Sequence, residues 1–301
     1  MFIMSGLVVQ TPHEEHQYLN LIREIINTGT WENTRNGKTK AIFGAHMKFS
    51  LKDGSIPLLT TKKVAWKTCF KELTWFIKGS TSNKELKENG VKIWNGNASK
   101  EFLESRGLDY EEDDLGPVYG HQWRHFNAEY SDCNEDYSGK GVDQLANIIK
   151  MLKNKDELGS RRLLISAWNP CQIDEMALPP CHVLMQFNVH QEKYLSCSLY
   201  QRSGDVGLGV PFNIASYSFL THIIAKHCGL EAYSFVHFIG NAHIYDDHIE
   251  QLEEQCKREP MAFPHLYLSN KHDNIENYSL QDIVWITPYT HHDVIKMDMR
   301  V

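Results

Sequence analysis

The chain has 301 residues, of which 42% are hydrophobic and 23% are charged, and its formal net charge is −7. This composition is typical of a soluble globular protein, and the negative charge argues against a protein that coats nucleic acid through its phosphates. No apolar run approaches the roughly 18 residues that cross a bilayer, and residues 1–10 lack a basic start and a small-residue cleavage signal. We therefore expect a cytoplasmic protein, with entry into the nucleus left open, and neither a membrane nor a nucleic acid as its partner.

The cysteines and histidines lack the spacings of a metal site or a disulfide framework. The seven cysteines are odd in number and contain no Cys-x-x-Cys pair, and the sixteen histidines include no His-Glu-x-x-His motif. The sequence has no Gly-x-Gly-x-x-Gly or Walker loop either, which argues against a dinucleotide fold and a kinase. We expect free thiols and no metal.

The first elements predicted along the chain are two helices with a connector between them. Residues 14–28 place apolar side chains on one helical face. Residues 31–44 are polar and rich in turn formers, so they indicate a connecting loop in which Arg35 is solvated. Residues 66–78 indicate a helix that is apolar nearly all round. Its Glu72 is either a surface carboxylate or one buried among bulky neighbours with a raised pKa.

The middle of the chain predicts a solvated insertion, a helix and a strand. The acidic run at residues 111–114 is typical of a solvated insertion, and residues 143–155 have the apolar spacing of an amphipathic helix. Residues 163–168 are a strand by their apolar and aromatic content. Arg161 and Arg162 precede this strand, either as a solubilising pair at a sheet edge or as an anion clamp.

The second half predicts a hairpin followed by alternating helices and strands. The expected elements are strands at 183–190 and 194–201, a helix at 213–228, a strand at 235–239 and a helix at 249–256. No linker, low-complexity stretch or internal repeat interrupts them. We therefore predict a single α+β domain over residues 1–301, with residues 1–12 as a flexible tail.

Cys181 stands out because it follows two prolines, which restrict the backbone and hold the thiol in place. Beyond the hairpin, Arg202 falls in a polar turn that contains glycine, where we expect it to fold back beside Cys181. A fixed cation near a fixed thiol favours the thiolate at neutral pH. His182 is too close in sequence to aim its ring readily at the neighbouring sulfur, and no papain or caspase signature surrounds Cys181, so a Cys-His protease is disfavoured.

Several long motifs, taken together, resemble the thymidylate synthase family. They are Ala177-Leu-Pro-Pro-Cys-His, Tyr200-Gln-Arg-Ser-Gly-Asp, Leu208-Gly-Val-Pro-Phe-Asn-Ile-Ala-Ser-Tyr and Ala242-His-Ile-Tyr, in this order. Asp114-Leu-Gly-Pro-Val-Tyr-Gly-His-Gln-Trp-Arg, Phe43-Gly, Pro57-Leu-Leu-Thr-Thr-Lys and Ser160-Arg-Arg extend the resemblance from about Arg35 to the C-terminus. It implies a large mixed, twisted β-sheet flanked by helices and packed against the sheet of a dimer mate. It also implies reductive methylation of deoxyuridylate (dUMP) to thymidylate, with 5,10-methylenetetrahydrofolate as the donor of carbon and hydride.

The resemblance also implies a set of catalytic residues. Cys181 would add to carbon 6 of uracil, and Glu72 would be a buried general acid and base. Tyr119 would assist proton removal from carbon 5, and Trp94 would shield the exocyclic methylene intermediate from water. Asn213 would read the uracil edge with one acceptor and one donor. The implied catalytic residues are Cys181, Glu72, Trp94, Tyr119, Arg202, Asp205 and Asn213.

The substrate contacts carry over in the same way. Arginines would surround the phosphate, with Arg161 and Arg162 donated by the second subunit of a homodimer, while His243 and Tyr245 would bind the sugar hydroxyl. The implied dUMP-binding residues are Arg35, Arg161, Arg162, Arg202, Ser203, Gly204, Asp205, Asn213, His243, Ile244 and Tyr245. The implied folate-binding residues are Lys63, Trp94, Asn97, Asp205, Leu208, Gly209, Phe212, Arg300 and Val301, the last two as a C-terminal latch.

A few positions depart from the family's pattern. Asn36 replaces a threonine, Asn95 and Asn241 each replace an aspartate, and Arg300 replaces a small residue. These changes bear on the rigidity of the Arg35 loop and on closure of the tail, hence on folate affinity and rate. The alternatives are a pyrimidine nucleotide hydroxymethylase, which the indole of Trp94 and the amide of Asn213 disfavour, and a catalytically weak homologue that only binds dUMP.

Overall fold

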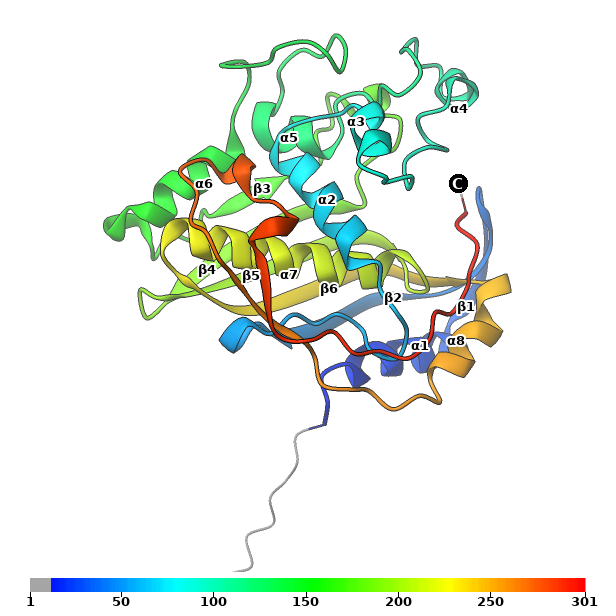
Figure 1. Ribbon diagram of the computed structural model, residues 1–301. Helices are drawn as coiled ribbons and strands as arrows, with labels where there is room; N and C mark the ends of the chain where they lie inside the picture. Colours follow the sequence, from blue (N-terminus) through cyan, green and yellow to red (C-terminus); the bar gives the residue numbers. More distant parts are fainter. Residues whose placement is uncertain (1–11, 301) are drawn as a thin grey trace, which may run out of the picture.

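The computed structural model describes residues 12–300, which form a six-stranded β-sheet with helices packed against it (Figure 1). The strand order is β1-β2-β6-β5-β4-β3, and β5 and β6 run parallel while the other neighbouring pairs are antiparallel. The predicted α+β class with a large mixed sheet is thereby confirmed. The tail predicted at residues 1–12 lies, apart from Pro12, outside the described residues.

The strands differ widely in length. They are β1 (Thr30–Thr34), β2 (Gly37–Ser50), β3 (Leu164–Ser166), β4 (His182–His190), β5 (Tyr194–Asp205) and β6 (Glu231–Tyr245). A separate small sheet pairs β7 (His265–Leu268) with β8 (Ile283–Thr287). In β4 and β5 buried side chains alternate with more exposed ones, because only one face of the large sheet carries the core.

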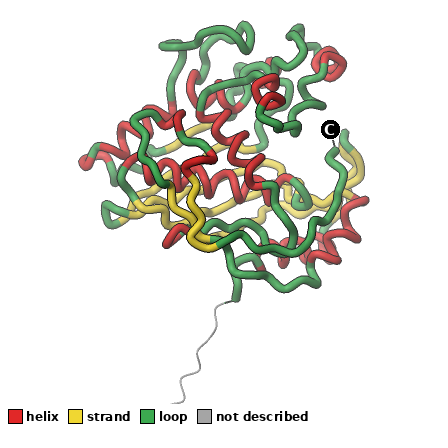
Figure 2. The backbone as a smooth tube through the Cα atoms, viewed as in Figure 1, coloured by secondary structure: helices red, strands yellow, loops and turns green. Residues whose placement is uncertain are grey.

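The helix that connects the parallel strands, α7 (Gly209–Cys228), is buried on most sides and packs against β5 and β6. It ends at Gly229, whose left-handed φ of 77° caps the last turn. The other helices are α1 (His16–Thr28), α2 (Trp66–Ile77), α3 (Asn83–Glu88), α4 (Lys100–Ser105), α5 (Tyr119–His125), α6 (Gln144–Lys153) and α8 (Ile249–Gln255). Figure 2 shows how loops join them. The predicted helices are confirmed, with α7 starting four residues earlier than the pattern indicated. Between residues 12 and 300 no helix has the length and apolar character needed to cross a membrane.

The sheet is longer than the sequence patterns predict. Residues 31–44 are not a connector but lie in the hairpin of β1 and β2, and the turn expected around Arg202 belongs to β5. Polar and glycine-rich residues continue as strand here because β5 and β6 satisfy each other's backbone groups out to the pair Asp205 and His243. A Cβ at Gly204 would lie 3.0 Å from Val210, so glycine permits the close packing of this strand end.

The acidic run at residues 111–114 is only partly solvated. Asp114 is buried, which contradicts the prediction, and its carboxylate accepts hydrogen bonds from the hydroxyl of Tyr130 (2.6 Å) and from the backbone N–H groups of Gly116 and Cys133 (both 2.9 Å). Tyr130 and Cys133 lie in a loop farther along the chain, and no local sequence pattern indicates that this loop approaches Asp114. Asp114 therefore organises the loops above α5 rather than facing water.

Candidate active site

Cys181 lies immediately before β4, in a loop held from both sides. Its N–H donates to the hydroxyl of Tyr119 (2.8 Å), and its carbonyl accepts from the N–H of Arg202 (2.9 Å). The guanidinium of Arg202 donates from Nε to the carbonyl of Pro180 (2.9 Å) and from Nη2 to that of Pro179 (3.0 Å). The structure thus brings Arg202 back to the Cys181 loop, and the two prolines present fixed carbonyls to it.

Burial raises the pKa of the Cys181 thiol, and the positive charge of Arg202 offsets this only in part. Arg202 acts in the direction expected from the sequence, since its charge lowers the thiol pKa, but the effect of burial is larger. Desolvation disfavours the charged thiolate, and the depth of the site is a property of the fold that the motif does not display. Cys181 is therefore held in a restrained loop where burial opposes the thiolate and the charge of Arg202 favours it.

Glu72 projects from α2 into the core, where only 9% of its surface remains exposed. Its Oε1 accepts a hydrogen bond from the indole Nε1 of Trp94 (2.7 Å). Burial raises the pKa of Glu72 to about 7. The buried alternative for this carboxyl is thus confirmed. Trp94 in turn lies edge-on to Tyr119, with the ring centroids 6.2 Å apart, so these three side chains form one wall near Cys181.

Asn213 lies in the first turns of α7, and its amide faces a buried space. Its Oδ1 makes no hydrogen bond of normal geometry with the residues that the structure describes, and the imidazole of His182 is its weakly interacting polar neighbour. A buried acceptor without a partner is rare in folded proteins and indicates a place for a donor from outside the chain. The neighbouring imidazole of His182 is neutral, because burial lowers its pKa to about 4.

The end of β5 is tied to the start of α7 by Asp205. Its Oδ1 accepts from the N–H groups of Gly207 (2.8 Å) and Leu208 (3.3 Å). The buried ammonium of Lys62 donates to the carbonyl of Gly207, and burial lowers the pKa of Lys62 to about 8 although the charge of Asp205 acts against this. Sequence reasoning missed Lys62, and Lys63, which it assigned to the folate, is exposed. The apolar segment before the two lysines could have indicated that one of them is buried, since neighbouring side chains in an extended chain point to opposite sides.

A second residue that sequence reasoning missed is Glu15, which holds the loop leading to Lys62. Its carboxylate is fully buried and accepts from the N–H and hydroxyl groups of Thr60 and Thr61, at 2.6 to 3.0 Å. These four donors satisfy a buried charge that would otherwise be costly. Nothing in the local sequence links Glu15 to two threonines so far along the chain.

The end of β6 carries the residues that the resemblance assigns to the sugar. His243 lies with its Nδ1 at 3.1 Å from Oδ1 of Asn241, and its ring meets that of Tyr245 edge-on at 5.5 Å. The pairing of β2 with β6 brings the turn between β1 and β2 beside Tyr245. In this turn Arg35 is exposed, and its Nε donates to Oδ1 of Asn36 (2.9 Å).

The last described residues run beside this end of β6. Arg300 forms an ion pair with Asp247, and its guanidinium lies 6.0 Å from the ring of Tyr245. The Nε2 of His248 is 2.9 Å from the carbonyl of Asp298, a second contact to the same segment. Val301, the other half of the predicted latch, lies outside the described residues.

Arg161 and Arg162 do not reach Cys181 within one chain. Both are exposed and precede β3, the edge strand farthest from β1. The register of β3, β4 and β5 sets Arg162 level with Ser196, about 20 Å along the strands from Arg202. Neither guanidinium has an ion-pair partner in the described part of the chain.

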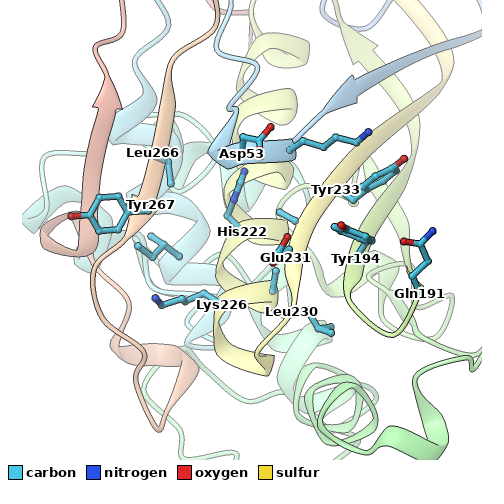
Figure 3. Close-up of a pocket in the computed structure, with 14 residues that line it drawn as sticks. Asp53, Gln191, Tyr194, His222, Lys226, Leu230, Glu231, Tyr233, Leu266 and Tyr267 are labelled. Atoms are coloured by element: carbon cyan, nitrogen blue, oxygen red, sulfur yellow. The ribbon is translucent and has the colours of Figure 1, made fainter.

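A cavity of about 540 Å³ lies at the opposite ends of β5 and β6 (Figure 3). Tyr194, one of its lining residues, is about 25 Å along β5 from Arg202. Tyr194, Tyr233, His222, Lys226 and Glu231 are among its lining residues, and none of the site residues predicted from the sequence lines it. Within residues 12–300 no group of three or more His, Cys, Asp and Glu side chains is arranged to hold a metal ion.

Comparison with known proteins gives the class to which this fold and site belong. The family model described as thymidylate synthase matches residues 16–301. The chain belongs to the thymidylate synthase family, a family of methyltransferases, and this membership supports thymidylate synthesis as its function. The resemblance found in the motifs is thus confirmed.

Individual relatives cover the chain almost completely. It is 52% identical over 292 residues to thymidylate synthase of Homo sapiens, which covers 96% of this chain and 92% of that protein. It is 50% identical over 290 residues to thymidylate synthase 1/2 of Encephalitozoon cuniculi, with 95% and 97% covered. It is also 50% identical over 296 residues to bifunctional dihydrofolate reductase-thymidylate synthase of Zea mays, with 98% of this chain but 56% of that protein covered. The chain therefore spans about half the length of its bifunctional relatives.

Proposed function

We propose that the protein converts dUMP to thymidylate in the cytoplasm, as one domain over residues 1–301, and takes 5,10-methylenetetrahydrofolate as its second substrate. The folate supplies a one-carbon unit and a hydride. The observation that carries the proposal is a restrained thiol, Cys181, whose neighbour in the chain, His182, lies beside the buried amide of Asn213. A nucleophile and a base reader held in neighbouring parts of the site suit a pyrimidine that contacts both.

Cys181 acts as the nucleophile. Its sulfur forms a bond to carbon 6 of uracil, and the electron pair of the 5,6 double bond moves toward the carbonyl oxygen at carbon 4. Two of the guanidinium N–H groups of Arg202 are used on proline carbonyls, so the remaining ones are free to face sulfur and phosphate. Arg202 therefore both fixes the loop and lowers the cost of the thiolate that forms during the reaction.

Asn213 selects uracil. Its Oδ1 accepts from the N–H at position 3 of the ring, and its Nδ2 donates to the neighbouring carbonyl. Cytosine has no N–H at this position, so it would leave the buried Oδ1 without this donor. Leaving a buried polar group unpaired is the strongest form of discrimination that a small pocket offers.

Glu72 exchanges protons with the base and its water. A carboxyl with a pKa of about 7 is populated in both protonation states near neutral pH, which suits a group that must give and take a proton. The indole of Trp94 is fixed by its bond to Glu72 and shields the reacting carbon from water. Tyr119 touches the N–H of Cys181 and assists proton removal from carbon 5.

The phosphate is bound by arginines from two subunits of a homodimer. Arg35, Arg202 and Ser203 come from one subunit, while Arg161 and Arg162, too far from Arg202 in their own chain, come from the other. The remaining dUMP contacts that we propose lie at the ends of β5 and β6 and in the first turns of α7: Gly204, Asp205, Asn213, His243, Ile244 and Tyr245.

The face of the sheet opposite the core supports this assembly. Phe43, Tyr200 and Phe238 are 84%, 43% and 45% exposed, and together they line a shallow cavity of about 280 Å³. Clustered exposed aromatic side chains mark a surface that is covered in the assembled protein. We propose that the sheets of two subunits pack there face to face.

The folate lies over the nucleotide, between the start of α7 and the loop that carries Trp94. Asp205 hydrogen-bonds the pterin through the carboxylate oxygen that is not used on Gly207, and Lys63 meets the glutamate tail. Arg300 closes the site from the C-terminal segment. The other folate contacts that we propose are Trp94, Asn97, Leu208, Gly209, Phe212 and Val301.

The test is a covalent complex. The protein is incubated with fluorinated deoxyuridylate and methylenetetrahydrofolate, digested, and mapped by mass spectrometry, and we expect the adduct on Cys181. In parallel, dUMP should give thymidylate and dihydrofolate. A hydroxymethyl product, or an adduct on another cysteine, contradicts the proposal.

A further inference from the structure

A line of three side chains crosses from the edge of the sheet to the sugar-binding end of β6. Glu32, on the exposed strand β1, accepts from Nδ2 of Asn241 through its Oε2 at 3.3 Å. Asn241 then presents its Oδ1 to Nδ1 of His243 at 3.1 Å. None of the motifs considered in the sequence includes Glu32.

The chemistry of the three groups fixes every proton in this line. A carboxylate only accepts, so Glu32 requires that the amide of Asn241 turn its Nδ2 toward it. The Oδ1 of Asn241 then faces His243, and an amide oxygen also only accepts. The imidazole must therefore carry its proton on Nδ1. Its Nε2 is left with a lone pair.

The surroundings of His243 keep the ring neutral. Burial lowers the pKa of His243, although the charge of Asp205 on β5, a hydrogen bond with the backbone of Asn241 and the charge of Glu32 on β1 act in the opposite direction. Tyr245, on the same strand, meets the ring edge-on. A neutral ring protonated on Nδ1 offers one acceptor, Nε2, to a ligand.

We propose that Glu32 is a positioning residue that acts through Asn241 to hold His243 in the Nδ1–H tautomer, so that Nε2 accepts a hydrogen bond from the sugar hydroxyl of the nucleotide. This inference rests on the proposed function, which assigns His243 to that hydroxyl. It also explains why an amide stands at position 241, where the family resemblance leads us to expect an aspartate. A carboxylate there would lie against that of Glu32, whereas an amide donates to Glu32 and accepts from His243.

The experiment compares two nucleotides in calorimetric titrations of the full chain. We expect Glu32→Ala to weaken dUMP binding by about threefold to fivefold, the effect of losing one partly exposed hydrogen-bonded charge. Binding of dideoxyuridine monophosphate, which lacks the 3′-hydroxyl, should not change. The turnover number at saturating dUMP should stay within about twofold. Glu24→Ala, which removes an exposed carboxylate from α1, is the matched control and should alter neither affinity.

Nitrogen NMR of the imidazole gives a readout that a general loss of structure would not move. The signals of His243 are assigned by their absence in His243→Gln, and the wild type should show a protonated Nδ1 and an unprotonated Nε2. Glu32→Ala should show a mixture of tautomers, and Glu32→Gln, whose carbonyl can still accept, should restore the wild-type pattern.

The inference is overturned by an equal loss of affinity for both nucleotides in Glu32→Ala, by a proton on Nε2 in the wild type, or by an unchanged dUMP affinity and tautomer in Glu32→Ala. If the wild type makes thymidylate and Glu32→Ala behaves like it, only the positioning role fails. If the wild type binds dUMP but makes no thymidylate, the proposed function fails while the tautomer can still be measured.

Discussion

The two ends of β5 and β6 both carry polar side chains but use them differently. At one end Glu72 is buried with a single neutral donor, Asn213 has an unpaired buried acceptor, and Cys181 is a thiol with a raised pKa. At the cavity end two ionisable side chains labelled in Figure 3, Glu231 and His222, already have protein partners. Lys193 bonds Glu231 at 2.9 Å, and Nε2 of His222 lies 3.0 Å from the backbone carbonyl of Ser55.

The difference shows where the fold keeps binding capacity. A polar group that already has a protein partner gains little from a ligand, whereas one left buried without a partner gains the full energy of the bond it makes. The Cys181 end is therefore less stable than it could be, and this cost is offset only when substrate fills it. The volume of the cavity at the other end does not by itself indicate a substrate site.

The largest effect is expected from Cys181→Ala. Thymidylate formation should fall by at least about 10⁴-fold, because no other group can form the bond to carbon 6, while dUMP affinity should change by less than about fivefold. Stopped assays of dihydrofolate formation and calorimetric titration with dUMP measure the two quantities. Cys171→Ala, which removes an exposed thiol, should leave both unchanged. Residual turnover near the wild-type rate in Cys181→Ala would move the nucleophile elsewhere.

Glu72→Gln should separate activity from stability. Turnover should fall by about 10²- to 10⁴-fold, the usual contribution of a general acid and base. Because burial raises the pKa of Glu72 to about 7, the folded state binds its proton more tightly than the unfolded chain does. Wild-type stability should therefore decrease as pH rises from about 4.5 to about 7, by up to about 3 kcal/mol.

A side-chain amide does not ionise, so Glu72→Gln should lack this decrease and unfold at a higher denaturant concentration than the wild type at about pH 8. Urea titrations at several pH values test this. If the stability of both proteins changed equally with pH, burial would not raise the pKa of Glu72.

His222→Gln should change the stability of the protein at acidic pH and leave its turnover number unchanged. Burial lowers the pKa of His222 to about 4, so the unfolded chain takes up a proton first as pH falls below 6.5. The wild type should lose up to about 3 kcal/mol of stability between pH 6.5 and about 4. His222→Gln should lose less, and its side-chain N–H can still donate to the carbonyl of Ser55. Thermal unfolding at about pH 5 and pH 7 measures the difference. A change in turnover number above about twofold would show that the cavity end and the Cys181 end are coupled, contrary to this prediction.

The smallest effect is expected from Glu231→Gln, which breaks the exposed pair with Lys193. Such surface pairs contribute about 0 to 1 kcal/mol, and salt screens them. Unfolding at low and high salt should differ from the wild type by no more than this, with unchanged KM for dUMP. A large loss of activity would give the cavity end a role in the reaction.

Much of the site could be predicted because its residues lie in long contiguous motifs. The proline pair before Cys181 already indicated a held thiol, and the crowded apolar pattern around Glu72 left its burial as one of two alternatives. The direction in which the pKa of the Cys181 thiol shifts could not be predicted, because it depends on how deeply the folded chain buries this side chain. Nor could the length of β5, since Arg202 is in a strand only because β6 pairs beside it.

The remaining gaps have the same origin in distance along the chain. Glu15 binds two threonines far along the sequence, and Asp114 is satisfied by Cys133 and Tyr130 from another loop. Lys62 rather than Lys63 is buried, a choice made by packing rather than by composition. Arg161 and Arg162 have sequence neighbours that indicate a clamp, yet one chain alone leaves them away from the site.

The parallel pairing of β5 and β6 has a kinetic consequence. Parallel neighbours cannot be joined by a tight turn, so the chain must first close the crossover formed by α7 before Arg202 and His243 come to the same sheet edge. The entropy cost of closing a long connection comes before the stabilising contacts form, so parallel strand pairs of this kind form slowly. During refolding, hairpins such as β1 with β2 should gain protection from hydrogen exchange first, and binding of dUMP should return last.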